Sequence, residues 1–254
     1  MDALLAVNIG NSRVGLGLFD LARSRAPLPR PDSATSVPVG DPDEFSPDFE
    51  TDAEPTACVL ASVNPRVEAA VVGWTRARFG VPVRRFPDDV PAPCPSAYRP
   101  PESAGADRLA NAVAAFAEQR RACIVVDAGS AITVDAVADD GTFLGGAILP
   151  GPVLAAGALA SKTALLPECE PRDEGAPIGA STGEAIRSGI LRGAAGAVDR
   201  LVADVGAELG GGPPAVLTGG AAPILQRLCR TEWVVRPHLT LSGLALAALR
   251  FREH

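Results

Sequence analysis

Apolar and polar positions follow two similar patterns about half the chain apart. Residues 4–18 read LLAVNIGNSRVGLGL, and residues 123–137 read CIVVDAGSAITVDAV. Each segment begins with an apolar run that ends in a polar residue, Asn8 or Asp127, then passes through a glycine and alternates again between apolar and polar positions. A strand, a tight glycine turn and a second strand are therefore predicted twice.

Both turns have the composition of a phosphate-binding loop. Glycine lets backbone N–H groups approach a phosphate, and a hydroxyl such as that of Ser12 or Ser130 adds a directional donor. A carboxylate at the strand end, as at Asp127, can hold a cation against the phosphates because hard cations prefer oxygen ligands. Two ordinary hairpins are the alternative for either segment alone. The repetition favours paired ATP-binding loops, which resemble those of duplicated sugar-kinase and actin-type folds.

The remaining pattern alternates strands and helices, which indicates an α/β protein. Strands are expected at residues 57–63, 81–86 and 215–218, and helices at residues 66–79, 109–121, 152–162, 180–208, 221–229 and 240–251. A proline-rich connector precedes the helix after Asp107. We place a domain boundary near residue 120, which divides the chain into domains 1–120 and 121–254.

Residues 20–56 interrupt the first domain. This stretch is rich in proline and acidic residues, and residues 41–54 contain seven acids and no base. Such a composition predicts an irregular, solvated and mobile insertion.

Composition limits the partners and the location of the protein. The 254 residues are 47% hydrophobic and 4% aromatic, so aliphatic side chains must fill the core. A net charge of −7 argues against nucleic acid or an anionic membrane as the main partner. No apolar stretch reaches transmembrane length and no secretory signal pattern opens the chain, so a cytoplasmic protein is expected. Five scattered cysteines without CxxC spacing predict incidental thiols.

The chain has few histidines and lysines, which limits the catalytic mechanisms open to it. Both histidines, His238 and His254, lie outside polar clusters, which argues against a histidine triad or metal site. The one lysine, Lys162, is not in a P-loop or in a protein-kinase strand motif. Arginine stays protonated, so a carboxylate must take any proton.

Asp107 and Arg108, in GADRLANAVAA, are the candidate catalytic pair. An acid in the first turn of a helix also interacts favourably with the helix dipole, and Arg108 could clamp an anion or lie on the surface. Local sequence leaves these alternatives open.

The motifs are more specific as an ordered series than one by one. They are Tyr98-x-x-Pro101-x-x-x-Gly105-x-Asp107-Arg108, Asp127-x-Gly129-Ser130-Ala131-x-Thr133-x-Asp135, Gly145-Gly146-x-Ile148-x-Pro150-Gly151, Thr163-Ala164-x-Leu166-Pro167, Thr182 and Thr218-Gly219-Gly220. The series resembles type III pantothenate kinase from residue 4 to about residue 248. This resemblance implies duplicated ribonuclease H-like α/β domains of the acetate and sugar kinase/Hsp70/actin superfamily, with mixed sheets flanked by helices. It also implies a homodimer that uses ATP to phosphorylate pantothenate, the first step of coenzyme A synthesis.

Residue roles follow from the same resemblance. Asp107 would be the general base for the primary hydroxyl of pantothenate, and Asp127 would bind K⁺ or NH₄⁺, while Mg²⁺ would accompany ATP. The implied substrate-binding residues are Tyr98, Gly105, Ala106, Asp107, Arg108 and Thr182. The implied ATP-binding residues are Asn8, Ile9, Gly10, Asn11, Ser12, Arg13, Val14, Gly15 and Ser130. The apolar helix after Asp107 is expected to need cover, which agrees with a homodimer.

Asn8 departs from the family, which has aspartate at this position. An amide keeps an oxygen acceptor but lacks the charge that holds hydrated Mg²⁺ against the phosphates. We therefore expect a slower kinase. Two alternatives stay open, namely a regulator that binds nucleotide or pantothenate without turnover, and a kinase for another small hydroxyl substrate.

Overall fold

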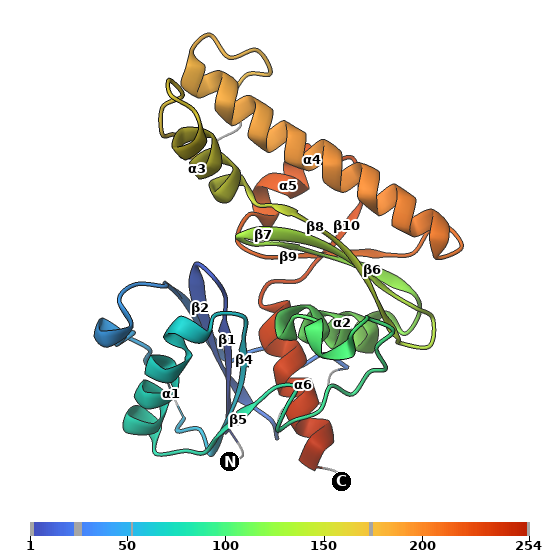
Figure 1. The fold of residues 1–254 in the computed structure, drawn as a ribbon. Coiled ribbons are helices and arrows are strands. Elements are labelled where there is room, and N and C mark those ends of the chain that lie inside the picture. The colour runs from blue at the N-terminus through green and yellow to red at the C-terminus, as the bar shows by residue number, and fades with distance from the viewer. Residues whose placement is uncertain (1–2, 23–26, 52, 173–174, 253–254) are drawn as a thin grey trace. The chain divides into compact units, whose positions relative to one another are not determined.

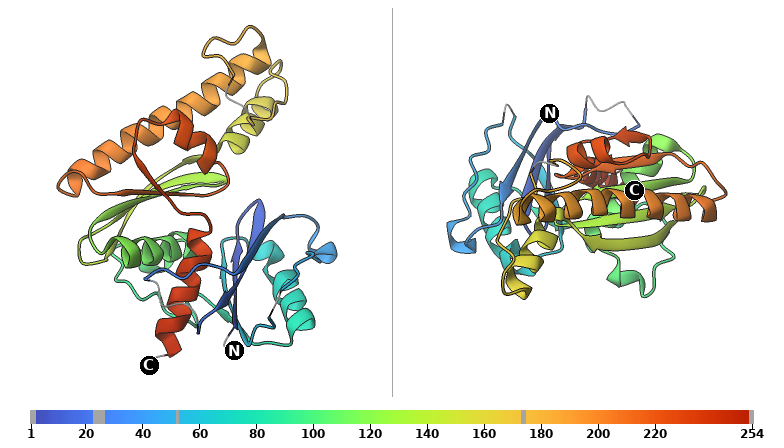
Figure 2. Two further views of the ribbon diagram at one scale, coloured as in Figure 1. Left: turned by 180° about the vertical axis from the view of Figure 1, so that it is seen from behind. Right: turned by 90° about the horizontal axis from the view of Figure 1, so that it is seen from above.

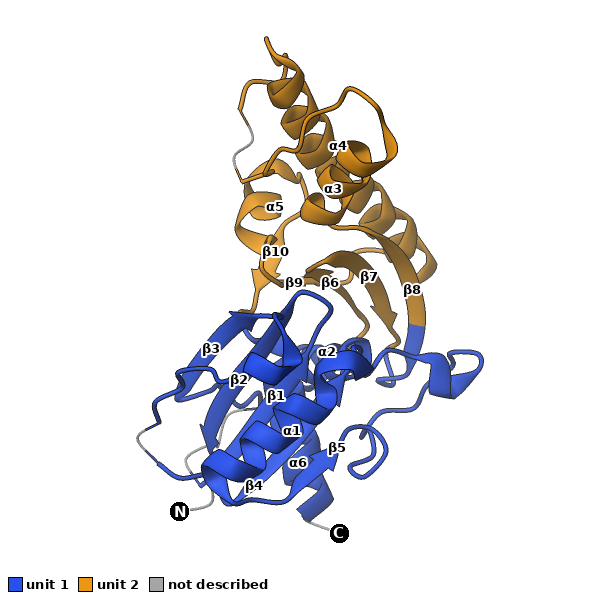
Figure 3. Cartoon of the chain, turned by 60° about the vertical axis from the view of Figure 1, so that its left-hand side comes forward, with its two compact units in different colours: residues 1–121, 139–144, 238–254 blue, residues 122–138, 145–237 orange. Residues whose placement is uncertain are grey.

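The computed structural model describes residues 3–22, 27–51, 53–172 and 175–252. Backbone contacts divide the chain into two compact units, which Figure 3 colours separately. The first unit comprises residues 1–121, 139–144 and 238–254, and the second comprises residues 122–138 and 145–237. The first change from one unit to the other falls after residue 121, and two later segments, residues 139–144 and 238–254, also belong to the first unit.

The first unit is built on a mixed five-stranded sheet with the order β3-β2-β1-β4-β5. Its strands are β1 (Ala3–Ile9), β2 (Arg13–Asp20), β3 (Ser33–Pro38), β4 (Ala57–Ser62) and β5 (Val83–Arg85). Strands β1 and β2 form the predicted antiparallel hairpin, and β1 pairs with β4 in parallel. The carboxyl end of β1 therefore lies beside the carboxyl end of β4.

The second unit repeats this arrangement. Its strands are β6 (Cys123–Ala128), β7 (Ala131–Val137), β8 (Phe143–Pro150), β9 (Ala215–Thr218) and β10 (Trp233–Val235). The strand order is β10-β9-β6-β7-β8. Read from the other edge, β8-β7-β6-β9-β10 corresponds strand by strand to β3-β2-β1-β4-β5 of the first sheet, with β6 in the place of β1. Strand β6 pairs antiparallel with β7 and parallel with β9, as β1 does with β2 and β4. The repeated strand order confirms a duplicated α/β architecture with mixed sheets.

Helices flank both sheets (Figure 1). They are α1 (Pro65–Phe79), α2 (Ala106–Gln119), α3 (Pro152–Lys162), α4 (Thr182–Glu208), α5 (Ala222–Leu228) and α6 (Leu239–Arg252), with short 3₁₀ turns η1 (Pro42–Glu44) and η2 (Pro101–Ser103). The long helix α4 runs along one face of the second sheet (Figures 1 and 2). None of the described helices is both long and apolar enough to span a membrane.

Helix α6 explains why the C-terminal residues belong to the first unit. It packs against α2 and β1, and in its buried seam Thr240 Oγ1 donates a hydrogen bond of 2.9 Å to Asn111 Oδ1. Most residues of α2 are buried, including Leu109 and Val113. The apolar surface of α2, which was expected to be covered by a second subunit, is therefore covered by α6 of the same chain.

Residues 20–56 are more ordered than their composition predicted. Strand β3 lies within this stretch and forms the edge of the first sheet through pairing with β2. Val37 and Phe45 pack against the core, and Phe49 is buried in it. The expectation of an irregular insertion was wrong for this part because scattered apolar side chains attach it to the sheet. Asp52, one of the seven acids, lies outside the described residues.

The cysteines are free thiols, as expected. Burial raises the pKa of Cys58 and of Cys229 to about 12 and that of Cys94 to about 11. These thiols are therefore protonated at neutral pH, which agrees with a packing role.

Candidate active site

The first glycine turn joins β1 to β2. Gly10 N–H donates to the Arg13 carbonyl oxygen at 2.9 Å, which closes the turn. Two neighbouring segments hold it, because Val63 N–H donates to the Ile9 carbonyl and Val39 N–H donates to the Ser12 carbonyl, both at 2.9 Å. The side chains of Asn11, Ser12 and Arg13 remain exposed at the tip, where they can meet a ligand.

Asn8 lies at the carboxyl end of β1, opposite Gly15 of β2. Its side chain is half-buried, and its Oδ1 atom is buried without a hydrogen-bond partner among the described residues. A buried, unpartnered oxygen normally carries a free-energy cost, which a cation or a hydrated cation beside it would remove. The donor chemistry at this position therefore fits the Mg²⁺ that accompanies ATP.

The second glycine turn joins β6 to β7, is one residue shorter than the first, and is held by its neighbouring segments in the same way. Gly129 N–H donates to the Ala131 carbonyl at 3.1 Å. Ala221 N–H donates to the Ala128 carbonyl at 2.8 Å, and Gly151 N–H donates to the Ser130 carbonyl at 2.9 Å. Ser130 is thus held by the chain that follows β8.

Asp127 is the next-to-last residue of β6 and pairs with Thr133 on β7. Gly219, just after β9, packs directly against it with a φ of 95°. A Cβ at residue 219 would lie 2.5 Å from Asp127 Oδ1, which no real side chain tolerates. The glycine of the Thr218-Gly219-Gly220 motif therefore has a structural reason, namely the close approach of its backbone to the Asp127 carboxylate.

Four of the expected substrate residues, Gly105 to Arg108, lie together at the start of α2. Gly105 precedes the helix, and Asp107 Oδ1 accepts a hydrogen bond of 2.8 Å from the Arg108 N–H. Arg108 is only 5% exposed, and its Nη1 donates to the Tyr98 hydroxyl at 3.2 Å. The surface alternative for Arg108 is thereby excluded, and the carboxylate, the guanidinium and the phenol form one cluster.

Burial raises the pKa of Asp107 above its ordinary value of 3.8. The Arg108 N–H and the Arg108 charge oppose this shift but do not cancel it. A carboxylate with a raised pKa is a stronger base, so the environment suits proton abstraction better than an exposed aspartate would.

Phe143 completes this cluster and was not identified from the sequence. Its ring lies against Tyr98 and Arg108 although it is the first residue of β8, 35 residues after Arg108 in the chain. The isolated pairing of Ser96 with Phe143 brings the two segments together. A lone phenylalanine before a Leu-Gly-Gly run carries no sequence signal for such a contact.

The remaining predicted residues belong to the second unit. Thr182 is the first residue of α4 and is exposed. It lies between the N-cap Ser181, whose Oγ accepts from the Glu184 N–H at 3.3 Å, and Glu184, whose Oε2 accepts from the Ala180 N–H at 2.7 Å. Among the described residues, no group of three His, Cys, Asp or Glu side chains is arranged to hold a metal ion.

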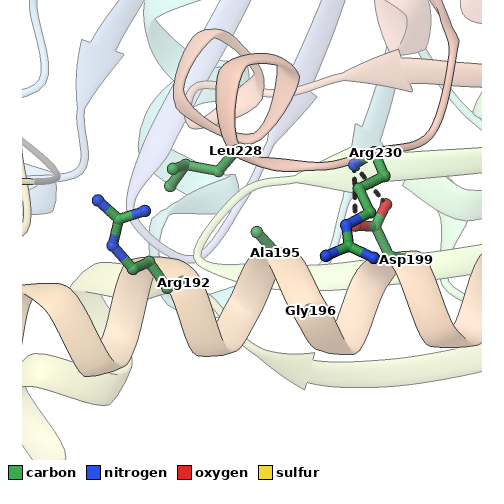
Figure 4. Close-up of a pocket in the computed structure, with 6 residues that line it drawn as sticks. All are labelled: Arg192, Ala195, Gly196, Asp199, Leu228 and Arg230. Carbon is green, nitrogen blue, oxygen red and sulfur yellow. Dashed lines mark hydrogen bonds between the residues drawn. The ribbon is translucent and has the colours of Figure 1, made fainter. Parts of the chain in front are cut away.

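A separate pocket of about 330 Å³ lies between α4 and the end of α5 (Figure 4). Its lining residues are Arg192, Ala195, Gly196, Asp199, Leu228 and Arg230. The Asp199 carboxylate accepts hydrogen bonds from the backbone N–H groups of Arg230 and Thr231 and from the Thr231 hydroxyl. Asp199 is thus occupied in fixing the turn after α5, and the pocket contains none of the predicted site residues.

Comparison with known proteins tests the resemblance directly. A sequence model of the type III pantothenate kinase family matches residues 4–204. A type III pantothenate kinase of Rubrobacter xylanophilus is 36% identical, with 98% of this chain and 100% of that protein covered. One from Anaeromyxobacter sp. strain K is 34% identical, with the same coverage.

Solved structures support the fold. A Campylobacter jejuni protein described as a putative Baf family transcriptional activator has a TM-score of 0.62 at 19% identity, covering 98% of this chain and 100% of its own. Porphyromonas gingivalis acetate kinase has a TM-score of 0.53 at 11% identity, covering 99% of this chain and 100% of its own. The duplicated sheets therefore have the fold of acetate kinase. The family match and the Rubrobacter and Anaeromyxobacter relatives, both covered over their full length, show that the chain belongs to the type III pantothenate kinase family.

Proposed function

We propose that this protein transfers the γ-phosphoryl group of ATP to pantothenate, producing 4′-phosphopantothenate for coenzyme A synthesis. Family membership supports the reaction, and the observation in the structure that supports it best is the cluster of the buried Arg108 with the half-buried Asp107 and Tyr98. Because ATP is available in the cytoplasm, we also place the protein there. No nucleic acid or membrane partner is part of this proposal.

In the proposed reaction, Asp107 accepts the proton of the primary hydroxyl of pantothenate. The hydroxyl oxygen forms a bond to the γ-phosphorus while the bond from that phosphorus to the bridging oxygen of ADP breaks. Such transition states are loose, so in-line geometry matters more than base strength. Arg108 provides a planar fork of N–H donors suited to the carboxylate of pantothenate, and Tyr98, Gly105, Ala106 and Thr182 complete the acceptor site.

ATP would contact both glycine turns. Residues Asn8 to Gly15 and Ser130 supply backbone N–H groups and hydroxyls for its phosphates. Mg²⁺, when bound, would neutralise charge on the phosphates, and the Asn8 oxygen would contact its hydration shell. We assign the monovalent cation, K⁺ or NH₄⁺, to the Asp127 carboxylate.

The neutral Asn8 side chain makes the proposed kinase slow. Removing one preorganised electrostatic contact costs on the order of two decades in rate. Because Asp107 and Asp127 are both retained, we infer reduced turnover and not its loss.

We also propose that the protein is a homodimer. The large hydrophobic side chains Ile148, Val153, Leu154, Leu165 and Ile178 of the second unit are between 55% and 92% exposed. We assign these exposed apolar side chains to the surface that a second subunit would cover. We expect light scattering at micromolar concentration to give twice the mass of 25.9 kDa. A monomer would contradict this part of the proposal.

A coupled ADP-release assay with pantothenate, Mg²⁺ and K⁺ tests the reaction. We expect activity in the wild type and none in Asp107→Asn, whose ATP affinity should stay within about twofold because the base acts on the acceptor. Glu102→Gln, which changes an exposed acid near the same helix, is the matched control. Equal loss of ATP binding in Asp107→Asn would point to a cation-binding role. A wild type without ADP release would favour a regulator or another hydroxyl acceptor.

The pH dependence of the stability of Asp107→Asn tests the burial of Asp107 independently of its role in catalysis. Because burial raises the folded pKa of Asp107 above its unfolded value, the ionised carboxylate lowers stability at pH values above that folded pKa. We expect Asp107→Asn to unfold at a higher denaturant concentration than the wild type at pH 7. This difference should shrink as the pH falls towards the ordinary pKa of aspartate. The wild-type kcat/KM should fall over the same acidic range, and a variant without added stability would contradict the assigned burial.

A further inference from the structure

We infer that Phe143 is a positioning residue for pantothenate, holding Tyr98 and Arg108 in the arrangement that binds the acceptor. This inference rests on the proposed function, because it takes Tyr98 and Arg108 as substrate residues. It assigns to Phe143 no contact with substrate and no part in the chemistry.

The backbone of Phe143 attaches the connector that carries Tyr98. Phe143 N–H donates to the Pro95 carbonyl, and the Phe143 carbonyl accepts from the Ala97 N–H, both at 2.9 Å. Residues 95–97 thereby pair with the first residue of β8, and Tyr98 follows immediately. A proline-rich connector without a sheet of its own is thus given a defined position next to the ring of Phe143.

The side chain of Phe143 continues this attachment. Its ring centroid lies 5.8 Å from that of Tyr98, with the planes inclined by 38°. Arg108 Cζ lies 5.4 Å from the centre of the Phe143 ring and 5.2 Å from that of Tyr98. The guanidinium is therefore close to two aromatic rings, at distances where cation–π attraction is effective.

Confinement of Arg108 has a consequence for binding. A free arginine loses rotamer freedom when its N–H donors are aligned with a carboxylate, and this loss weakens affinity. Arg108 is already 95% covered and is hydrogen-bonded to the Tyr98 hydroxyl before any ligand binds. The Phe143 ring, itself 0% exposed, limits the space into which either side chain can move.

The turn before Phe143 is itself fixed to the helix that carries Arg108. Gly141 has a φ of 87°, and a Cβ there would lie 2.7 Å from the ring of Phe116 on α2. Asp140 Oδ1 accepts a hydrogen bond of 2.9 Å from the Thr142 N–H and shapes this turn. Phe143 is therefore held relative to α2 on one side and to the Tyr98 connector on the other.

Phe143→Leu tests the inference, because leucine keeps an apolar side chain but has no aromatic face. We expect the KM for pantothenate to rise about tenfold, which corresponds to about 1.4 kcal/mol, whereas kcat and the KM for ATP should change less than about twofold. Phe143→Tyr retains the ring and should restore the pantothenate KM to within about threefold of the wild type. If Phe143→Leu does not fold, Phe143→Met takes its place.

Phe19→Leu is the matched control, because Phe19 is also 0% exposed in the first unit but lies on β2. It should lose comparable stability without a change in the KM for pantothenate. If Phe143→Leu changes only stability, as Phe19→Leu does, the positioning role is overturned. Arg108→Lys tests the acceptor site separately. If the KM for pantothenate is unchanged in Arg108→Lys, Arg108 does not bind the acceptor, and the proposed site itself is wrong.

Discussion

The two glycine turns differ in length and in side chains but are held by neighbouring segments in the same way. In both, the chain after the parallel neighbour strand donates a hydrogen bond to the hairpin strand, from Val63 in the first turn and from Ala221 in the second. In both, the chain after the outer strand donates to the turn itself, from Val39 and from Gly151. The correspondence of the two sheets therefore extends to individual hydrogen bonds.

The two turns differ in the side chains near the ends of the strands that precede them. Before the first turn, the next-to-last residue of β1 is the neutral Asn8, and Asn64 Nδ2, from the segment after β4, donates to the Gly10 carbonyl at 3.5 Å. Before the second turn, the next-to-last residue of β6 is Asp127, and Gly219, just after β9, packs its backbone against that carboxylate. The hydrogen bonds that hold the two turns therefore correspond, whereas only the second turn has a charged side chain at this place.

Asp127→Asn would make the second turn resemble the first and has the largest expected effect. If the one remaining strand-end carboxylate binds the monovalent cation, we expect kcat to fall by about 10² to 10³. In the wild type, K⁺ and NH₄⁺ should support turnover and Na⁺ should not, and this dependence should disappear in the variant. Asp204→Asn, an exposed acid paired with Arg200, is the control. Equal rates in all three salts would remove the cation assignment.

Asn8→Asp would make the first turn resemble the second. Because the substitution restores charge beside an otherwise unpartnered oxygen position, we expect kcat with pantothenate to rise, by up to about two decades. The measurement is the same ADP-release assay, with Gln226→Glu, at an exposed position of α5 outside the predicted site, as the control for charge alone. No gain in turnover would show that the defect extends beyond this residue and would favour the regulator or the altered-acceptor alternative.

Gly219→Ala tests whether the second turn depends on a close backbone approach. The new Cβ would overlap Ala128 and the Asp127 carboxylate at a φ of 95°, so we expect the free energy of unfolding to fall by about 2 kcal/mol. Gly220→Ala is the matched control, since a Cβ there meets no atom within 4 Å. Chemical denaturation gives both values. Similar stabilities for the two variants would argue against the packing described for Gly219.

Gly10→Ala has the smallest expected effect on stability. A Cβ at this position would lie 3.2 Å from the Arg13 carbonyl oxygen, a tight contact that a small shift relieves. We expect a loss of about 1 kcal/mol or less, together with a several-fold rise in the KM for ATP, because a methyl group hinders the approach of a phosphate. Isothermal denaturation and steady-state kinetics measure the two effects. An unchanged ATP KM would contradict phosphate binding by this turn.

Local pattern was sufficient for much of the secondary structure. The helix predicted at residues 152–162 and the strand at residues 215–218 coincide with α3 and β9, and both hairpins form as predicted. These elements have strong apolar periodicity or clear boundaries at glycine and proline. Strands β3 and β10 were missed because neither has a marked apolar alternation, and pairing with a neighbouring strand determines both.

The sequence alone therefore determined the α/β class, the two glycine turns, the family and the candidates Asp107 and Asp127, because each depends on short-range patterns or on the identity of single residues. Only the tertiary structure showed that α6 belongs to the first unit, that Arg108 is buried and that the Phe143 ring lies beside that of Tyr98. These features depend on contacts between residues far apart in the chain. Such contacts arise from packing, which leaves no periodic mark in the sequence.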